Sequence, residues 1–216
     1  MQTLHTVNLV IHVSLGTLGL LLGLITLIYQ NQYQRHIRFG RYFLYALTVV
    51  VATALIGILF FRSNPFLLML TLLGGYVGYS GYRSVRLKEK RSSPADTLLT
   101  ISVLVASILY ARSIQLAAGS WSPAVIYSTM SALWLVTGYD LIKHLWLYQR
   151  LQNWWLYEHI YKMMSAYSAL ASAFSGTVLS HFKPYSQILP SVVCILFIIY
   201  FIRKQIEKRM LTNLGD

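Results

Sequence analysis

The chain has 216 residues, of which 56% are hydrophobic and only 11% are charged, and its mean hydropathy is +0.55. Soluble domains carry about 25% charged residues, so this composition excludes an ordinary soluble domain and a soluble nucleotide-binding fold. The single cysteine, Cys194, excludes an intrachain disulfide and therefore a secreted disulfide scaffold. We expect an integral membrane protein.

Long apolar runs predict an all-α bundle of seven transmembrane helices that forms one polytopic domain over residues 1–216. About 20 apolar residues cross a bilayer as a helix, and seven such runs use most of the chain. The last run is the shortest, and we expect its helix to extend into the basic tail. The predicted spans are 7–29, 41–61, 66–82, 97–118, 124–145, 154–180 and 188–202.

Several connections carry local signals. Residues 30–40 are predicted to form a polar connection before the second span. Asn64-Pro65 and the segment 119–123 have the composition of turns. Ser93-Pro94-Ala95-Asp96 resembles the first turn of a helix, where proline and an acidic residue are favoured.

The charge of +12 comes from 18 Lys and Arg against six Asp and Glu. These cations fall almost entirely in alternate connections, and the connections between them hold only Arg62 and Lys183. Cytoplasmic loops of membrane proteins are enriched in Lys and Arg. The pattern predicts an N-terminus outside and a cytoplasmic C-terminus, and it makes nucleic acid an improbable partner.

Small residues recur at four-residue spacing on three of the predicted helices. Gly19 and Gly23 lie on the first helix, and glycines 74, 75, 78 and 81 lie on the third. The sixth helix carries two such rows, Ser165, Ala169 and Ala173, and Ser168, Ser172 and Gly176. Such spacing is typical of helices that pack closely in a membrane. The alternative is that bare backbone leaves room for a flat prosthetic group or a lipid tail.

The six histidines separate by predicted depth into two groups. His36, His144 and His159 fall near the cytoplasmic face, and His5, His12 and His181 fall near the outer face. Three imidazoles suit a transition metal, so the first group is a candidate metal site. His159 is the best single candidate, because it lies about one turn inside its helix.

Two histidines on different helices also suit haem b, which is often held by a histidine pair. His12 with His181, and His36 with His159 or His144, would give one haem site near each membrane face. The alternative is that these histidines are simply solvated near the surface, since no close pair such as HxxxH occurs.

Charged residues near the cytoplasmic ends of the fifth and sixth spans form a second candidate site. Asp140 precedes His144 by four residues, and Glu158 precedes Lys162 by four, a spacing that allows an ion pair. Ionisable groups inside a membrane often mark a functional site. Asp140, Glu158 and Lys162 are therefore predicted to line a polar cavity, unless their side chains snorkel to the surface.

Four short segments resemble a group of uncharacterised bacterial multi-helix membrane proteins. They are residues 35–41 (RHIRFGR), Asn64-Pro65-Phe66, Gly81-Tyr82-Arg83, and Trp154-Trp155-Leu156 ahead of His159. In that group, histidines recur at positions that match His12, His36 and His159. Similar histidine-bearing helices occur in cytochrome b-like and oxidase-assembly proteins. The resemblance implies the same architecture and a bacterial plasma membrane.

Three functional hypotheses follow. The first is a membrane protein that binds haem or a transition metal through histidines and serves electron transfer or redox-enzyme assembly. The second is a small transporter or lipid-handling protein with a polar cavity near the cytoplasmic face. The third is an accessory subunit without a site of its own, in a homo-oligomer or a membrane complex. No combination of nucleophile and base predicts an enzyme.

Overall fold

The computed structural model describes residues 2–61, 65–115 and 123–213, and in these ranges the chain is helical with no strand. Short turns join some of the helices: the π-helical η1 (Lys143–Leu147), α6 (Tyr148–Leu151), η2 (Gln152–Trp154) and η3 (Ser180–Phe182). The long helices are α1 (Gln2–Ile28), α2 (Tyr33–Phe61), α3 (Pro65–Leu87), α4 (Pro94–Gln115), α5 (Pro123–Ile142), α7 (Trp155–Val178) and α8 (Tyr185–Asn213).

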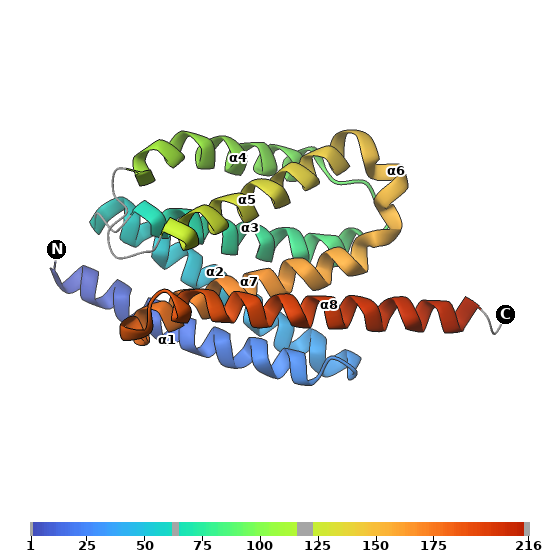
Figure 1. The fold of residues 1–216 in the computed structure, drawn as a ribbon, viewed down its shortest axis with the longest axis horizontal. Helices are drawn as coiled ribbons and strands as arrows, with labels where there is room; N and C mark the ends of the chain where they lie inside the picture. Colours follow the sequence, from blue (N-terminus) through green and yellow to red (C-terminus); the bar gives the residue numbers. More distant parts are fainter. Residues whose placement is uncertain (1, 62–64, 116–122, 214–216) are drawn as a thin grey trace.

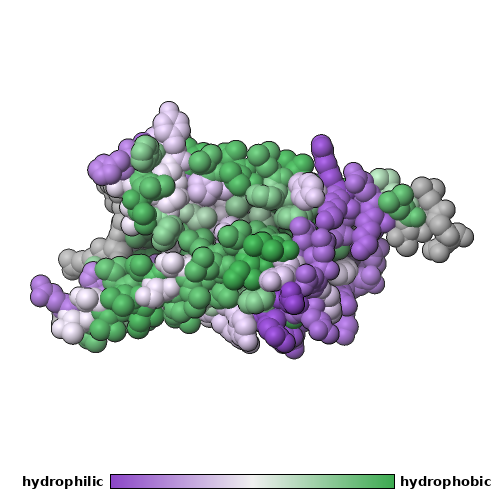
Figure 2. All heavy atoms as spheres, turned by 90° about the horizontal axis from the view of Figure 1, so that it is seen from below, coloured by the Kyte–Doolittle hydropathy of each residue, from purple (hydrophilic) through white to green (hydrophobic). Residues whose placement is uncertain are grey.

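Successive long helices run in opposite directions along one bundle axis, so the two termini lie at opposite ends of the bundle (Figure 1). The α1–α2, α3–α4 and α5–α7 connections lie at the same end as the C-terminus. Most of the Lys and Arg residues lie in these connections, in the helix turns beside them or in the C-terminal part of α8, and hydrophilic side chains gather at this end in Figure 2. We call it the basic end.

Five helical segments are long and apolar enough to cross a membrane: Gln2–Ile28, Tyr33–Phe61, Pro94–Ala111, Pro123–Val178 and Tyr185–Leu211. The fourth combines two predicted spans, 124–145 and 154–180, because the chain stays helical through the reversal at α6. Helix α3 is absent from this group, although 66–82 was a predicted span. Its sequence is interrupted by glycine, tyrosine, serine and arginine residues, which lower its apolar character.

The helices extend beyond the apolar runs. The prediction of a polar connection at residues 30–40 is wrong, since α2 begins at Tyr33. Apolar residues mark the part of a helix that lies in lipid, and its backbone hydrogen bonds continue into the polar region. The last helix continues to Asn213, which confirms the expected extension into the tail. The turns predicted at Asn64-Pro65 and 119–123 lie wholly or largely outside the described residues.

Glycines bring α1, α2, α3 and α7 into close contact. A Cβ atom added at Gly23 would lie 2.5 Å from the Tyr167 ring, and one at Gly78 would lie 2.6 Å from Leu47. At Gly81 the nearest atom would be Cβ of Lys162, at 2.9 Å. The predicted close packing is confirmed at these positions. Side chains fill the space beside each glycine, so the alternative of a slot for a flat group is wrong there.

The predicted start of α4 is confirmed. The Ser93 hydroxyl accepts from the Asp96 backbone N–H at 3.3 Å, and Asp96 Oδ2 accepts from the Ser93 backbone N–H at 2.9 Å. This reciprocal arrangement is a capping box, which satisfies amide groups that have no partner inside the helix. Asp96 is thereby fixed with its carboxylate toward α3.

Replacing Ser93 by alanine is expected to lower the free energy of unfolding by about 1 kcal/mol, because one helix-capping hydroxyl is lost. Thermal unfolding in mild detergent measures the change. Ser92→Ala is the matched control, since the Ser92 hydroxyl makes no hydrogen bond within the described ranges. Equal melting temperatures for the two variants would contradict the assigned cap.

Candidate polar site at the basic end of the bundle

A buried network of charged side chains joins α3, α5 and α7. Asp140 lies at the end of α5, and Lys143 begins the π-helical turn η1 that follows it. Glu158 and Lys162 lie one turn apart on α7. Extra residues in a π-helical turn shift the side chains that follow, and such turns are frequent at functional sites. Lys143, at the start of this turn, faces α7, where its ammonium group donates to Glu158.

The first ion pair joins α5 to α7. Lys162 Nζ donates to Asp140 Oδ1 at 2.6 Å, and the Tyr76 hydroxyl of α3 donates to Asp140 Oδ2 at 2.6 Å. Asp140 is 1% exposed and Lys162 is 2% exposed. Both charges are therefore removed from solvent, and each has a partner at short distance.

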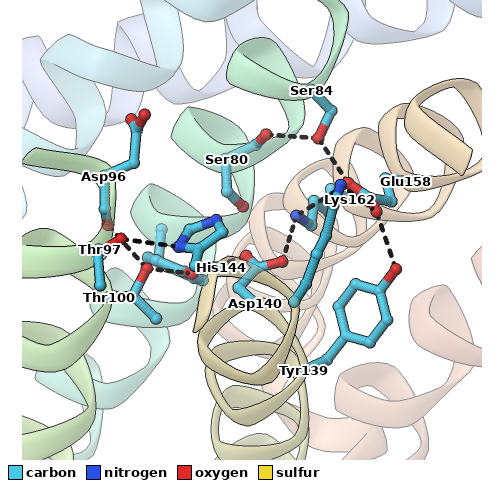
Figure 3. A network of polar contacts seen from close by, with 12 residues as sticks. Ser80, Ser84, Asp96, Thr97, Thr100, Tyr139, Asp140, His144, Glu158 and Lys162 are labelled. Atoms are coloured by element: carbon cyan, nitrogen blue, oxygen red, sulfur yellow. Dashed lines mark hydrogen bonds and ion pairs between the residues drawn. The ribbon is translucent and has the colours of Figure 1, made fainter. Parts of the chain in front are cut away.

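The second ion pair lies beside the first. Lys143 Nζ donates to Glu158 Oε1 at 2.6 Å, and the Tyr139 hydroxyl donates to the same oxygen at 2.8 Å. The Ser84 hydroxyl completes the site at 3.3 Å from Oε2 (Figure 3). Glu158 is 2% exposed. The snorkelling alternative is thus wrong for Asp140, Glu158 and Lys162.

Lys162 links the two pairs. Its Nζ atom lies 3.9 Å from Glu158 Oε2, so the ion pair expected from their four-residue spacing is present. The closest partner of Lys162 is nevertheless Asp140, and the closest partner of Glu158 is Lys143. One ammonium group is shared between two carboxylates. A change in the charge of either carboxylate would therefore move the Lys162 ammonium group.

A third pair lies nearer the surface. The Arg83 guanidinium donates two hydrogen bonds to Asp96, from Nε at 2.8 Å and from the terminal nitrogen at 2.7 Å, and Tyr79 donates a third at 2.8 Å. Such a two-point contact is strong and directional. Counting Arg83 with Lys143 and Lys162, the network holds three cations and three anions, so its charges balance.

A cavity of about 30 Å³ adjoins the network, and its wall includes Ser80, Arg83, Lys143, His144, Glu158 and Lys162. Residues 88, 90 and 92 of the α3–α4 connection also line it, so it lies toward the basic end. A water molecule needs about 10–15 Å³ by this measure. Of the three residues predicted to line a polar cavity, Glu158 and Lys162 do so, whereas Asp140 is not among the lining residues. The cavity is far below the roughly 300 Å³ that a drug-sized ligand needs.

The Ser80 hydroxyl supports the presence of water in this cavity. Ser80 is 9% exposed, and its hydroxyl has no hydrogen-bond partner among the described residues. An unpaired buried hydroxyl is costly, and ordered water is its usual partner. Figure 3 shows Ser80 beside Ser84, whose hydroxyl donates to the Ser80 carbonyl at 2.9 Å.

The structure separates the three histidines of the predicted cytoplasmic group. The His36 and His159 rings lie 6.4 Å apart, centroid to centroid. His144 instead lies on the wall of the polar cavity, with Nδ1 3.4 Å from the Thr97 hydroxyl. Among the described residues, no three His, Cys, Asp or Glu side chains form a group that could hold a metal ion. The three-histidine site is therefore not assembled.

The outer histidines are also separate. His12 Nδ1 lies 2.9 Å from the Thr53 hydroxyl. His181 is exposed on η3, and the described part of the chain shows no contact between these two rings. His5 packs against Phe61, with ring centroids 4.7 Å apart. The structure thus gives no support to the predicted haem pair His12–His181.

The sequence does not identify Lys143, Tyr76 or Tyr139 as members of the polar network. Four polar residues within six positions, Tyr139, Asp140, Lys143 and His144, were the available signal, because such a cluster is unusual inside an apolar span. The interhelical pairing itself could not be read from sequence spacing.

Comparisons of this chain with protein-family models, with curated proteins and with solved structures find no match.

Proposed function

We propose that this chain is a small polytopic membrane transport protein that moves protons, with Asp140 as its buried proton-binding group. Ionisable residues buried in a membrane bundle are costly and often form proton relays. The observation that carries the proposal is the sharing of Lys162 between Asp140 and Glu158, at 2.6 Å and 3.9 Å.

Protonation of Asp140 has a defined structural consequence. A neutral Asp140 releases Lys162, which is then drawn to Glu158. The acid also donates to the Tyr76 oxygen, and Tyr76 turns its own proton to the Thr100 hydroxyl, which lies 2.9 Å away. The network thus has two arrangements that differ by one proton, which is what a relay requires.

Asp140 lies among polar groups from α3, α5, α7 and the turn that follows α5. Besides its direct partners Tyr76 and Lys162, the groups that interact with it electrostatically are Tyr139, His144 and Tyr161. Glu158 shares Lys162 with it.

The cavity favours protons over larger cargo. Its volume of about 30 Å³ suits one or two water molecules, which can carry a proton from the basic end to the network. The lipid-handling alternative needs a far larger space than this cavity of about 30 Å³. The proposal therefore narrows the predicted transporter to one whose cargo, or coupling ion, is the proton.

Buried polar groups continue along α7 and α8 toward the opposite end. The Ser191 hydroxyl lies 3.0 Å from the Ser168 hydroxyl and 3.2 Å from the Ser172 hydroxyl. Gln187 is 2% exposed, and its side-chain amide has no partner in the described part of the chain. These groups offer sites for water beyond the charged network, as a path across the membrane needs.

The proposal includes the predicted membrane orientation, with seven crossings and the basic end in the cytoplasm. The alternating helix directions and the opposite positions of the termini support it (Figure 1). The enrichment of cations at one end supports the same orientation. The proton-binding network then opens toward the cytoplasm.

Proton movement can be tested in liposomes that contain the purified protein and a trapped pH-sensitive dye. We expect a potassium diffusion potential to drive faster proton uptake than in liposomes without protein. The double variant Asp140→Asn, Lys162→Met is expected to lose this excess, because the buried proton acceptor and its counter-charge are both removed.

Glu207→Gln is the matched control, since Glu207 is an exposed carboxylate on α8 outside the network. It is expected to retain the wild-type rate. Wild-type protein that gives no uptake above empty liposomes would contradict the proposal. So would a folded double variant that moves protons at the wild-type rate.

A further inference from the structure

His36 and His159 form a pair that the proton network does not use. His36 lies in the first turns of α2, and His159 lies in the first turns of α7. Their ring centroids are 6.4 Å apart, and the ring planes are inclined by 77°. Both rings are half-buried, so the pair lies inside the bundle wall and away from bulk solvent.

Both imidazoles have the same nitrogen held by a backbone carbonyl. His159 Nδ1 lies 3.0 Å from the Gly81 carbonyl oxygen, and His36 Nδ1 lies 3.1 Å from the Thr26 carbonyl oxygen. A carbonyl only accepts hydrogen bonds, so each Nδ1 carries a proton. In the neutral ring, Nε2 then has its lone pair available for a ligand.

This arrangement is typical of histidines that bind metals. A metal-binding imidazole usually donates its second ring N–H to a carbonyl or carboxylate, which fixes the tautomer and the ring orientation. An ion held in a nearly linear arrangement at about 2.0–2.1 Å from each Nε2 would place the two ring centres roughly 6 Å apart. The measured centroid separation of 6.4 Å is compatible with such an ion.

A thioether sulfur lies next to Gly81, the residue that contacts His159. Met163 follows His159 by one helical turn, and its sulfur atom packs against Gly81, 3.1 Å from the position that a Cβ atom would take there. Gly81 is the residue whose carbonyl holds His159. Imidazole and thioether groups together favour copper(I) over harder cations such as magnesium or calcium.

We propose that His36 and His159 bind one copper(I) ion near the basic end of the bundle, with Met163 as a third, weaker ligand. The nearest carboxylate along the chain, Glu158, points to Lys143 and Ser84. It is therefore engaged elsewhere. Lys162 and Met163 fill the space beside Gly81, so a bare ion fits this site better than a haem.

Copper binding can be measured by competition with a chromogenic copper(I) chelator, using purified full-length protein under reducing conditions. We expect one copper(I) per chain. His36→Ala and His159→Ala are each expected to weaken binding by at least tenfold, because each removes an imidazole ligand. Met163→Leu is expected to weaken it less.

His181→Ala is the matched control, since His181 is exposed on η3, and it is expected to bind copper like the wild type. If His159→Ala fails to fold, His36→Ala and X-ray absorption of the wild-type complex provide the test, with nitrogen and sulfur neighbours expected around copper. Folded wild type that binds no copper(I) would overturn the proposal. Copper binding that survives loss of both histidines would also overturn it, as would a haem spectrum in the purified protein.

The copper proposal stands apart from proton movement. Within the described structure, neither histidine contacts Asp140 or Lys162. His36→Ala is therefore expected to leave proton uptake in liposomes unchanged. Wild-type protein that binds copper(I) without moving protons, or that moves protons without binding copper(I), would show which of the two proposals fails.

Discussion

Replacing Asp140 by asparagine is expected to lower the free energy of unfolding by about 3 kcal/mol. Removing one partner of a buried ion pair costs about 3–5 kcal/mol, because the other charge is left without compensation. The lower end applies here, since Glu158 lies 3.9 Å from Lys162 and can partly neutralise it. Unfolding in mixed detergent, followed by circular dichroism, measures the change.

A variant in which both Asp140 and Lys162 are replaced by uncharged residues distinguishes the effect of an unpaired buried charge from the effect of altered packing. The double variant Asp140→Asn, Lys162→Met is expected to recover most of the lost stability, because buried ion pairs replaced by uncharged groups are often tolerated. A double variant that is less stable than Asp140→Asn alone would contradict this assignment. It would mean that Lys162 is held by groups other than Asp140.

Replacing Gly23 by alanine is expected to destabilise the bundle by about 1–3 kcal/mol, the usual cost of overpacking a core. The new methyl group would lie 2.5 Å from the Tyr167 ring, so the ring, which packs against Phe43, must shift to admit it. Alanine stabilises a helix by about 1 kcal/mol relative to glycine, and this gain in the free energy of unfolding offsets part of the overpacking cost.

Gly138→Ala is the control for the intrinsic stabilisation of a helix by alanine. A Cβ atom at Gly138 meets no described atom within 4 Å, so this variant is expected to be as stable as the wild type or up to about 1 kcal/mol more stable. The same unfolding measurement compares both variants. Equal stabilities for Gly23→Ala and Gly138→Ala would contradict the close contact of α1 with Tyr167.

The architecture was largely predictable because lipid imposes it. Long apolar runs must be helical in a bilayer, and these runs located each of the long helices. The helix ends were less predictable, as the early start of α2 at Tyr33 shows. Hydropathy reports which residues face lipid, whereas a helix ends where its hydrogen bonds end. Helix α3 shows that a long helix need not be strongly apolar when neighbouring helices cover it.

The polar site was predictable in part. Asp140, Glu158 and Lys162 were recognised because charges are rare inside apolar runs, and the structure brings them together. Their main partners were not recognised, because Lys143 looks like an ordinary loop cation. Pairing across helices depends on how α5 and α7 are rotated about their axes, which residue spacing along the sequence does not report.

The most direct test of the central claim is infrared difference spectroscopy of the folded protein between neutral and acidic pH. We expect acidification to produce carboxylic acid C=O bands that shift in heavy water, and the component from the buried Asp140 to be missing from the Asp140→Asn, Lys162→Met variant. Glu207→Gln should keep this component. Bands that persist unchanged in the double variant would contradict the assignment of Asp140 as the buried proton-binding group.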